Sequence, residues 1–292
     1  MIKGTGVAIV TPFNKNNKVD IASLEKLINY IIDGGVDFIV SLGTTSEAVT
    51  LSSDEQQLVM DVVVAAVAKR VPIIMGLGGN NTQAVIDKIK TNDFSGIDAV
   101  LSVAPYYNKP NQRGIYAHFA EIAKLCPKPI ILYNVPGRTS SNISAETCLK
   151  LANDFDNIIA VKEASGNMSQ VMEILKNRPR DFSVLSGDDA LTFPMMALGG
   201  DGVISVVANA YPKEFSNMIK LCLENNFVDS RKIHFSLLAF IDLLFADGNP
   251  AGIKAALEIM GIMKNNLRLP MVSVEDEHYK EIEGFVSNYK QL

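Results

Sequence analysis

The sequence is poor in the two residue types that most often form disulfides or hold metals. Only three cysteines occur in 292 residues, and none is part of a CxxC pair. We therefore expect reduced thiols that pack in the core of a cytoplasmic protein. These are Cys126, Cys148 and Cys222. The three histidines fall in separate predicted helices without metal-ligand spacing, so we expect no metal site. They are His118, His234 and His278.

Other familiar signals are also absent. The chain has no GxxxxGK(S/T), GxGxxG or GxSxG pattern, which removes the phosphate-loop, dinucleotide-binding and nucleophile-elbow motifs. The most apolar predicted helix, residues 59–68, contains Asp61 and is too short to cross a bilayer, so we expect neither export nor membrane insertion. The net charge of −5 argues against nucleic acid or an anionic membrane as the partner. Small molecules remain as the expected ligands.

Eight short apolar runs rich in β-branched residues recur along the chain, with helical patterns between them. They cover residues 6–10, 38–42, 72–77, 99–104, 129–135, 158–161, 182–186 and 202–207. Runs without clean alternation suit parallel strands buried on both faces, and the intervening segments suit crossover helices. The order predicts an α/β protein with a (β/α)8 TIM barrel. An open, doubly wound sheet of eight strands is the alternative.

Several residues mark the predicted helix starts. Asp20 can cap the helix that follows the first run, and Asn167 with Gln170 marks a later start. Ser53 with Gln56 has the spacing of a capping box. Each signal supports a helix between two strands.

The pattern changes after residue 224. Residues 229–245, 250–260 and 274–289 have helical periodicity without intervening strands. We therefore expect a barrel domain over residues 1–224 and a small helical C-terminal region over residues 225–292.

Lys162 is the clearest candidate for a reactive side chain. It is the only cation in residues 157–166, where a short apolar run ends in a charge and then in small residues. A buried lysine loses the hydration that favours its ammonium form, so its pKa falls and a neutral amine can attack a ketone to form an imine. An ordinary strand-end lysine with its head in water is the commoner case when this segment is taken alone.

In a barrel, the residues after each strand line one mouth, where barrel enzymes keep their active sites. Hydroxyls, phenols, a guanidinium and an amine fall there: Thr44, Thr45, Tyr107, Tyr133, Arg138 and Lys162. The threonine pair can form an anion nest or a simple turn, and we weigh these readings evenly. The tyrosines can pass protons, although a buried tyrosine more often satisfies only its own hydrogen bond. Arg138 suits a carboxylate, with a surface arginine as the alternative. We expect Glu47 and Glu163 to be structural hydrogen-bonding or paired groups and not acids or bases, and we expect Asp188-Asp189 to cap the next helix.

The order and identity of these segments resemble one enzyme family. The matching motifs are Gly43-Thr-Thr-Ser-Glu, Pro105-Tyr-Tyr-Asn, Tyr133-Asn-Val-Pro-Gly-Arg-Thr, Val161-Lys-Glu-Ala-Ser-Gly-Asn, Leu185-Ser-Gly-Asp-Asp and Gly202-Val-Ile-Ser-Val. Together they are similar to the dihydrodipicolinate synthase and N-acetylneuraminate lyase family of class I aldolases. The resemblance spans almost the whole chain, and Asn249-Pro250 and Lys254 extend it into the helical tail. Arg138 points to the synthase branch, because sialic acid lyases do not keep an arginine there.

The resemblance implies a reaction in diaminopimelate and lysine biosynthesis, the condensation of pyruvate with L-aspartate 4-semialdehyde. It implies that Lys162 forms the Schiff base and that Tyr133, Thr44 and Tyr107 relay protons. Tyr107 would reach in from a neighbouring subunit. The implied substrate-binding residues are Thr45 with the Thr44 backbone for pyruvate, Arg138 for the semialdehyde, and the main chain of Gly187 and Ile204.

The resemblance further implies that turnover needs no cofactor and no metal, and that the assembly is a homotetramer built from tight dimers. Two other functions stay open. One is a sister pyruvate-dependent aldolase that acts on a sialic acid or a 2-keto-3-deoxy sugar acid. The other is a barrel that has lost catalysis and serves as a binding protein, against which the complete set of hydroxyls and the lysine argues.

The chain departs from the family pattern where lysine-inhibited relatives carry histidines and a glutamate. Ser53, Gln56 and Ala84 occupy these positions, although Tyr106 and Asn80 are kept. Without the glutamate, the ammonium group of an effector lacks its charge partner. We predict weak or absent inhibition by lysine, and half-inhibition at sub-millimolar lysine in a steady-state assay would contradict this.

Overall fold

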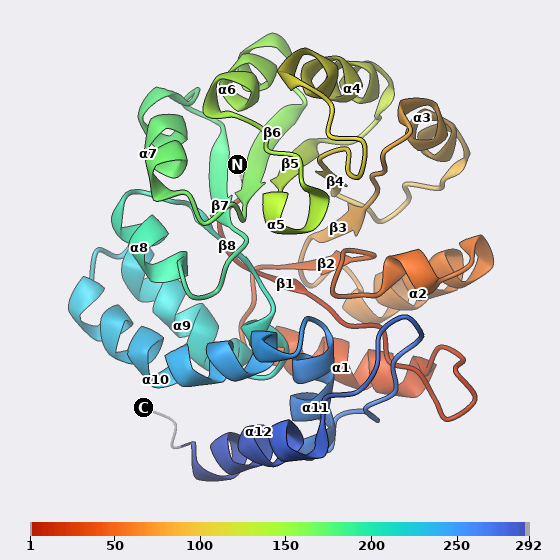
Figure 1. Ribbon diagram of the computed structural model, residues 1–292, viewed down its shortest axis with the longest axis vertical. Coiled ribbons are helices and arrows are strands. Elements are labelled where there is room, and N and C mark those ends of the chain that lie inside the picture. Colours follow the sequence, from red (N-terminus) through yellow and green to blue (C-terminus); the bar gives the residue numbers. More distant parts are fainter. Residues whose placement is uncertain (1, 290–292) are drawn as a thin grey trace. The chain divides into compact units, whose positions relative to one another are not determined.

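The computed structural model describes residues 2–289. Eight strands form a closed barrel in which they follow one another in chain order (Figure 1). The strands are β1 (Gly4–Ala8), β2 (Phe38–Ser41), β3 (Ile73–Gly76), β4 (Ala99–Val103), β5 (Ile130–Asn134), β6 (Ile158–Glu163), β7 (Ser183–Ser186) and β8 (Gly202–Ser205). Adjacent strands such as β5 and β6 run parallel, and nearly every strand residue is buried. The predicted barrel is confirmed.

Helices fill the connections between the strands and the C-terminal region. They are α1 (Ile21–Asp33), α2 (Ser53–Val67), α3 (Thr82–Thr91), α4 (Gln112–Leu125), α5 (Pro136–Thr139), α6 (Ala145–Asp154), α7 (Met168–Asn177), α8 (Thr192–Ala197), α9 (Pro212–Leu223), α10 (Phe227–Ala246), α11 (Ala251–Ile259) and α12 (Asp276–Asn288). Two 3-10 turns, Ala48–Thr50 and Val207–Asn209, follow β2 and β8. None of the described helices is long and apolar enough to cross a membrane.

The chain divides into two compact units. Of the described residues, the first unit contains 2–4 and 73–204, and the second contains 5–72 and 205–289. In the first unit, asparagine and serine side chains cap the helices: Asn81 caps α3, Asn111 caps α4, Ser144 caps α6 and Asn167 caps α7. Each side chain accepts a hydrogen bond from an otherwise unpaired N–H group of the first turn.

The second unit contains the predicted C-terminal helices α10, α11 and α12. Aromatic rings join α10 to α12: Phe240 stacks on Phe285 with ring centroids 5.0 Å apart, and the edge of Tyr211 contacts Phe240 at 4.9 Å. Such pairs add to the stability that burial of the rings provides. The three helices confirm the predicted helical region, while a domain boundary after residue 224 stays a prediction.

Three local predictions were wrong in detail. The capping box at the start of α2 uses Ser52 and Glu55, because Ser53 is already helical while Ser52 is extended. Lys162 lies within β6 and not beyond it, because its backbone still pairs with the strands on both sides. Asp188 does not cap α8, which begins at Thr192; its carboxylate accepts hydrogen bonds from the N–H groups of the preceding turn.

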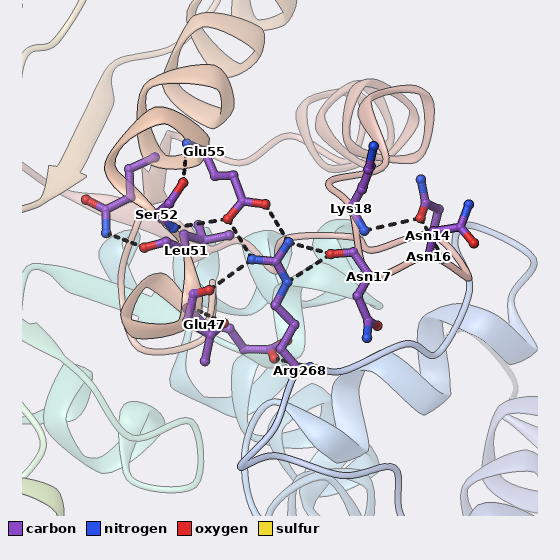
Figure 2. A network of polar contacts seen from close by, with 11 residues as sticks. Asn14, Asn16, Asn17, Lys18, Glu47, Leu51, Ser52, Glu55 and Arg268 are labelled. Carbon is purple, nitrogen blue, oxygen red and sulfur yellow. Dashed lines mark hydrogen bonds and ion pairs between the residues drawn. The ribbon is translucent and has the colours of Figure 1, made fainter.

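Arg268 ties the segment after α11 to the start of α2 (Figure 2). Its guanidinium group forms a bidentate bond with the carboxylate of Glu55, at 2.7 and 2.5 Å, and donates to the carbonyl oxygen of Thr50 at 2.9 Å. The Nε–H group donates to the carbonyl oxygen of Asn17 at 3.0 Å. Hydrogen bonds from Arg268 lower the pKa of Glu55 to about 2. Two segments far apart in the sequence are thereby held together.

The lowered pKa of Glu55 predicts a pH-dependent contribution to stability. A carboxyl group with a folded-state pKa below its usual value stabilises the fold above that usual value and loses the contribution as the pH falls. Glu55→Gln should therefore lower the free energy of unfolding by about 1 kcal/mol at neutral pH, a value set by the partial exposure of the pair. The difference should shrink as the pH falls from 4.5 to about 2. Urea unfolding of both proteins across this range measures it, and a difference independent of pH would contradict it. Glutamine can still accept the capping hydrogen bond from the Ser52 N–H, so the substitution removes the charge and one of the two acceptors for Arg268 but keeps the cap.

Candidate active site

Lys162 lies near the C-terminal end of β6 with only 5% of its surface exposed. Its register partners are Tyr133 on β5 and Leu185 on β7. The amine nitrogen lies 4.4 Å from the centre of the Tyr133 ring, and Tyr133 is itself buried. The ring face stabilises the ammonium form but accepts no proton from it. Within residues 2–289, Lys162 forms no ion pair with a carboxylate. The amine is therefore removed from water without being neutralised by an acid.

Gly187, directly after β7, leaves the space that the Lys162 side chain occupies. A Cβ atom at this position would lie 2.9 Å from Cε of Lys162 and 2.8 Å from the Cβ of Ala164. Both distances are shorter than normal carbon contacts. The Gly187 N–H group donates to the carbonyl oxygen of Glu163 at 2.8 Å, which fixes the backbone against β6. Lys162, Tyr133 and Gly187 thus form one cluster, as predicted.

The side chain of Glu163 contacts other residues than the side chain of its neighbour Lys162 does. Its carboxylate accepts hydrogen bonds from Nδ2 of Asn134 at 3.1 Å, from Nε2 of Gln170 at 2.9 Å and from the N–H of Ser165 at 2.8 Å. The prediction of a structural hydrogen-bonding role for Glu163 is confirmed. Burial raises the pKa of the Cys148 thiol, and the charge of Glu163 raises it further. Cys148 therefore stays a protonated thiol in the core.

Two predicted site residues lie at the surface of the first unit. Arg138 is exposed on the short helix α5. Tyr107 is 82% exposed, has a left-handed backbone with φ of 76°, and donates its N–H to the carbonyl oxygen of Thr139 at 3.4 Å. This hydrogen bond joins the segment that carries Tyr107 to the short helix that carries Arg138. Ile204 is fully buried in β8, so only its main chain can serve a ligand.

The second unit carries the predicted threonine pair on the loop after β2. Thr44 is exposed, whereas Thr45 is buried. The Oγ1 atom of Thr45 accepts a hydrogen bond of 3.0 Å from Nδ2 of Asn249. The Ser46 hydroxyl donates to the carbonyl oxygen of Ile9 at 2.6 Å. Thr44 is therefore open to solvent, whereas Thr45 is buried and hydrogen-bonded to Asn249.

A buried ion pair lies below this loop. Glu47 pairs with Lys254 of α11, and both side chains are almost completely inaccessible. Burial lowers the pKa of Lys254 to about 8, and the neighbouring charge of Glu47 opposes that shift. The prediction that Glu47 is a paired group is confirmed. Its partner was missed, although a lysine among the apolar residues that begin the segment Ala251–Ile259 is a signal that could have drawn attention to it.

The histidines do not form a metal centre. Burial lowers the pKa of His118 to about 4, and its Nδ1 atom lies 2.9 Å from the hydroxyl oxygen of Thr82. His118 lies in α4, His234 in α10 and His278 in α12. In the part of the chain that the structure describes, no three histidines, cysteines or acidic residues come together in a group that could hold a metal ion.

The contact between Gly187 and Lys162 predicts the effect of adding one methyl group. Gly187→Ala should displace the amine of Lys162 and lower kcat about tenfold or more, because small misplacements of a reacting group are costly. The flexible lysine can move, whereas the Cβ of Ala164 can shift only with its backbone, so we expect some loss of stability with the fold preserved. Gly284→Ala on the exposed face of α12, where a Cβ meets nothing within 4 Å, is the matched control. Steady-state kinetics with circular dichroism measures both, and an unchanged kcat in Gly187→Ala would count against the proposed position of the amine.

Comparison with known proteins places the chain in a family. Residues 1–289 match the family model described as "Dihydrodipicolinate synthetase family". The chain is 52% identical over 281 residues to the 4-hydroxy-tetrahydrodipicolinate synthase of Parabacteroides distasonis, covering 96% of this chain and 95% of the relative. It is 50% identical to the enzyme of the same name from Flavobacterium psychrophilum, over 99% of this chain and 98% of the relative.

Solved structures give the same result. The crystal structure of dihydrodipicolinate synthase from Aquifex aeolicus superimposes with a TM-score of 0.95 at 41% identity, covering 99% of this chain and 98% of that chain. The dihydrodipicolinate synthase of Thermotoga maritima gives a TM-score of 0.96 at 37% identity, covering 99% of each chain. The match is full-length in both sequence and structure, and the chain belongs to the dihydrodipicolinate synthetase family.

Proposed function

We propose that this chain is a 4-hydroxy-tetrahydrodipicolinate synthase that condenses pyruvate with L-aspartate 4-semialdehyde in the pathway to diaminopimelate and lysine. The observation that carries the proposal is the buried amine of Lys162 beside the Tyr133 ring, at the strand position where the family motif has its lysine. Full-length relatives with this enzyme name support it. Several of them are about half identical to the chain, which favours the synthase over a sister aldolase acting on sugar acids.

The chemistry begins at the amine of Lys162. Its neutral form adds to the keto carbon of pyruvate, and loss of water gives an imine between Nζ and that carbon. The protonated imine withdraws electrons, so a proton leaves the methyl carbon and an enamine forms. The enamine carbon then bonds to the aldehyde carbon of the semialdehyde, whose oxygen takes up a proton. The lysine is released when the substrate's own amine replaces it and closes the ring.

The other predicted residues bind the substrates or move protons. Tyr133, whose ring lies beside Lys162, begins the proton relay, and Thr44 and Tyr107 continue it. Thr45 and the Thr44 backbone bind the pyruvate carboxylate, and Arg138 binds the carboxylate of the semialdehyde through its planar guanidinium group. The main chain of Gly187 and Ile204 contributes further contacts to the substrate. All groups that carry a step are side chains or main-chain atoms of the protein, so the reaction as proposed uses no cofactor and no metal.

We propose a cytoplasmic homotetramer built from two tight dimers. The exposure of Tyr107 supports this assembly, because a phenol that serves the relay needs a less hydrated surrounding than an isolated chain gives it. A neighbouring subunit that covers Tyr107 would supply that surrounding. Light scattering after size-exclusion chromatography measures the assembly, and a monomer with full activity would contradict it.

The role of Lys162 predicts a covalent adduct. Borohydride reduction in the presence of labelled pyruvate should attach one label per chain at Lys162, identified by mass spectrometry after digestion. Lys162→Ala should lose the label and lower turnover roughly a thousandfold or more, because it removes the group that forms the covalent intermediate.

Two comparisons make this experiment decisive. Lys176→Ala, which removes an exposed lysine of α7, should keep both the label and the turnover. Cleavage of a sialic acid or a 2-keto-3-deoxy sugar acid at a rate above that of the condensation would favour the sister aldolase. A label on another lysine would contradict the mechanism.

A further inference from the structure

The loop that carries Thr44 and Thr45 has an unfavourable backbone conformation that its own hydrogen bonds do not fully restrain. Leu42 and Glu47, which flank the threonine pair, both have left-handed backbones, with φ of 56° and 52°. Residues with a Cβ atom rarely adopt this conformation, and it persists only where the surroundings impose it. Inside the loop, the N–H groups of Ser46 and Glu47 donate to the carbonyl oxygens of Gly43 and Thr44 at 3.2 and 3.1 Å. The remaining restraints must come from outside the loop.

The first restraint is the Glu47 carboxylate. It pairs with the ammonium group of Lys254, which also donates to the carbonyl oxygen of Asn266 at 2.9 Å and lies 4.3 Å from the centre of the Phe13 ring. The second carboxylate oxygen of Glu47 accepts a hydrogen bond of 3.1 Å from the backbone N–H of Arg268. Loss of Lys254 would leave a buried, unpaired carboxylate directly beneath the threonines.

The second restraint is the side chain of Arg268 (Figure 2). It donates to the carbonyl oxygen of Thr50, three residues after Glu47, and holds Glu55 at the start of α2. The guanidinium group also lies 4.4 Å from the centre of the Phe13 ring, so this ring contacts both Lys254 and Arg268. The far end of the loop is thereby fixed to the same segment as Glu47.

The third restraint acts on a single hydroxyl group. Nδ2 of Asn249 donates to Oγ1 of Thr45, and both side chains are at least nine-tenths buried. Because that oxygen already accepts a hydrogen bond from Asn249, the hydroxyl hydrogen of Thr45 is left to donate to another acceptor. A carboxylate is the acceptor that such a hydrogen suits best.

We propose that Asn249 and Lys254 are positioning residues for the keto-acid carboxylate: Asn249 directs the Thr45 hydroxyl toward it, and Lys254 holds the loop backbone through Glu47. This inference rests on the proposed function, in which Thr45 binds the pyruvate carboxylate. The segment from Asn249 to Arg268 thus acts on substrate affinity without touching the substrate.

The test is steady-state kinetics of Asn249→Ala and Lys254→Met with both substrates varied. The KM for pyruvate should rise about fivefold or more in each variant, while kcat and the KM for L-aspartate 4-semialdehyde stay within about threefold of the wild type. A merely structural role would lower the amount of active protein and leave the pyruvate KM unchanged. Lys264→Met makes the same substitution at an exposed position of the same segment and should leave the kinetics at wild-type values.

A charge-balanced double variant tests the route through Glu47. Glu47→Gln combined with Lys254→Met leaves no buried unpaired charge and keeps an acceptor for the Arg268 N–H group. Its pyruvate KM should equal that of Glu47→Gln alone, because Lys254 acts on the loop through the Glu47 carboxylate. If Lys254→Met raises the pyruvate KM further in the Glu47→Gln background, the route through Glu47 is overturned.

The remaining outcomes separate the two proposals. A rise in pyruvate KM of less than about fivefold in folded Asn249→Ala and Lys254→Met overturns the positioning role. If Lys254→Met does not fold, Asn249→Ala, which removes a neutral side chain, decides by the same criterion. Absence of condensation and of the borohydride label in the wild type would instead overturn the proposed function.

Discussion

Within residues 2–289 the protein buries two lysines, Lys162 and Lys254, and the different ways in which it compensates their charges organise the rest of the molecule. Lys254 has a carboxylate, a carbonyl oxygen and a ring face around its ammonium group, so its charge is nearly balanced in place. Lys162 has the Tyr133 ring but, within residues 2–289, no acidic partner. A lysine whose nitrogen is already held by an ion pair and a hydrogen bond is not available to a substrate, whereas one without these bonds is. The same residue type therefore supports the structure at one position and is available for chemistry at the other.

The parallel strands make this division possible. Register places Lys162 beside Tyr133 and the next residue, Glu163, beside Asn134. Because successive side chains of a strand point to opposite faces, the amine and the carboxylate of adjacent residues have separate surroundings. The Glu163 carboxylate accepts hydrogen bonds from the side chains of Asn134 and Gln170. It fixes the end of β6 and does not neutralise the amine beside it.

The fold was predictable because its signals are local. Each strand is a short β-branched run, and each helix has its own periodicity and cap, as at Asp20 and Asn167. The choice between Ser52 and Ser53 as the cap of α2 was not local, since Glu55 is held by Arg268, 213 residues further along the chain. The cluster of Lys162, Tyr133 and Gly187 followed from strand ends and family motifs. The partners of the threonine loop did not, because Asn249 lies 204 residues from Thr45 and no periodicity connects the two.

The C-terminal helices consequently do more than cover apolar surface. A loop with left-handed residues at Leu42 and Glu47 is unfavourable on its own, so whatever imposes that backbone also sets the direction of the threonine hydroxyls. Several of the imposing groups lie in the segment from Asn249 to Arg268, and the hydrogen bond from the Ser46 hydroxyl to the carbonyl oxygen of Ile9 adds to them. A change in how these helices pack would therefore reach the threonine pair through Glu47 and Asn249 before it altered any strand. The direction of the threonine hydroxyls and the packing of the C-terminal region are linked for that reason, although the two are encoded at opposite ends of the sequence.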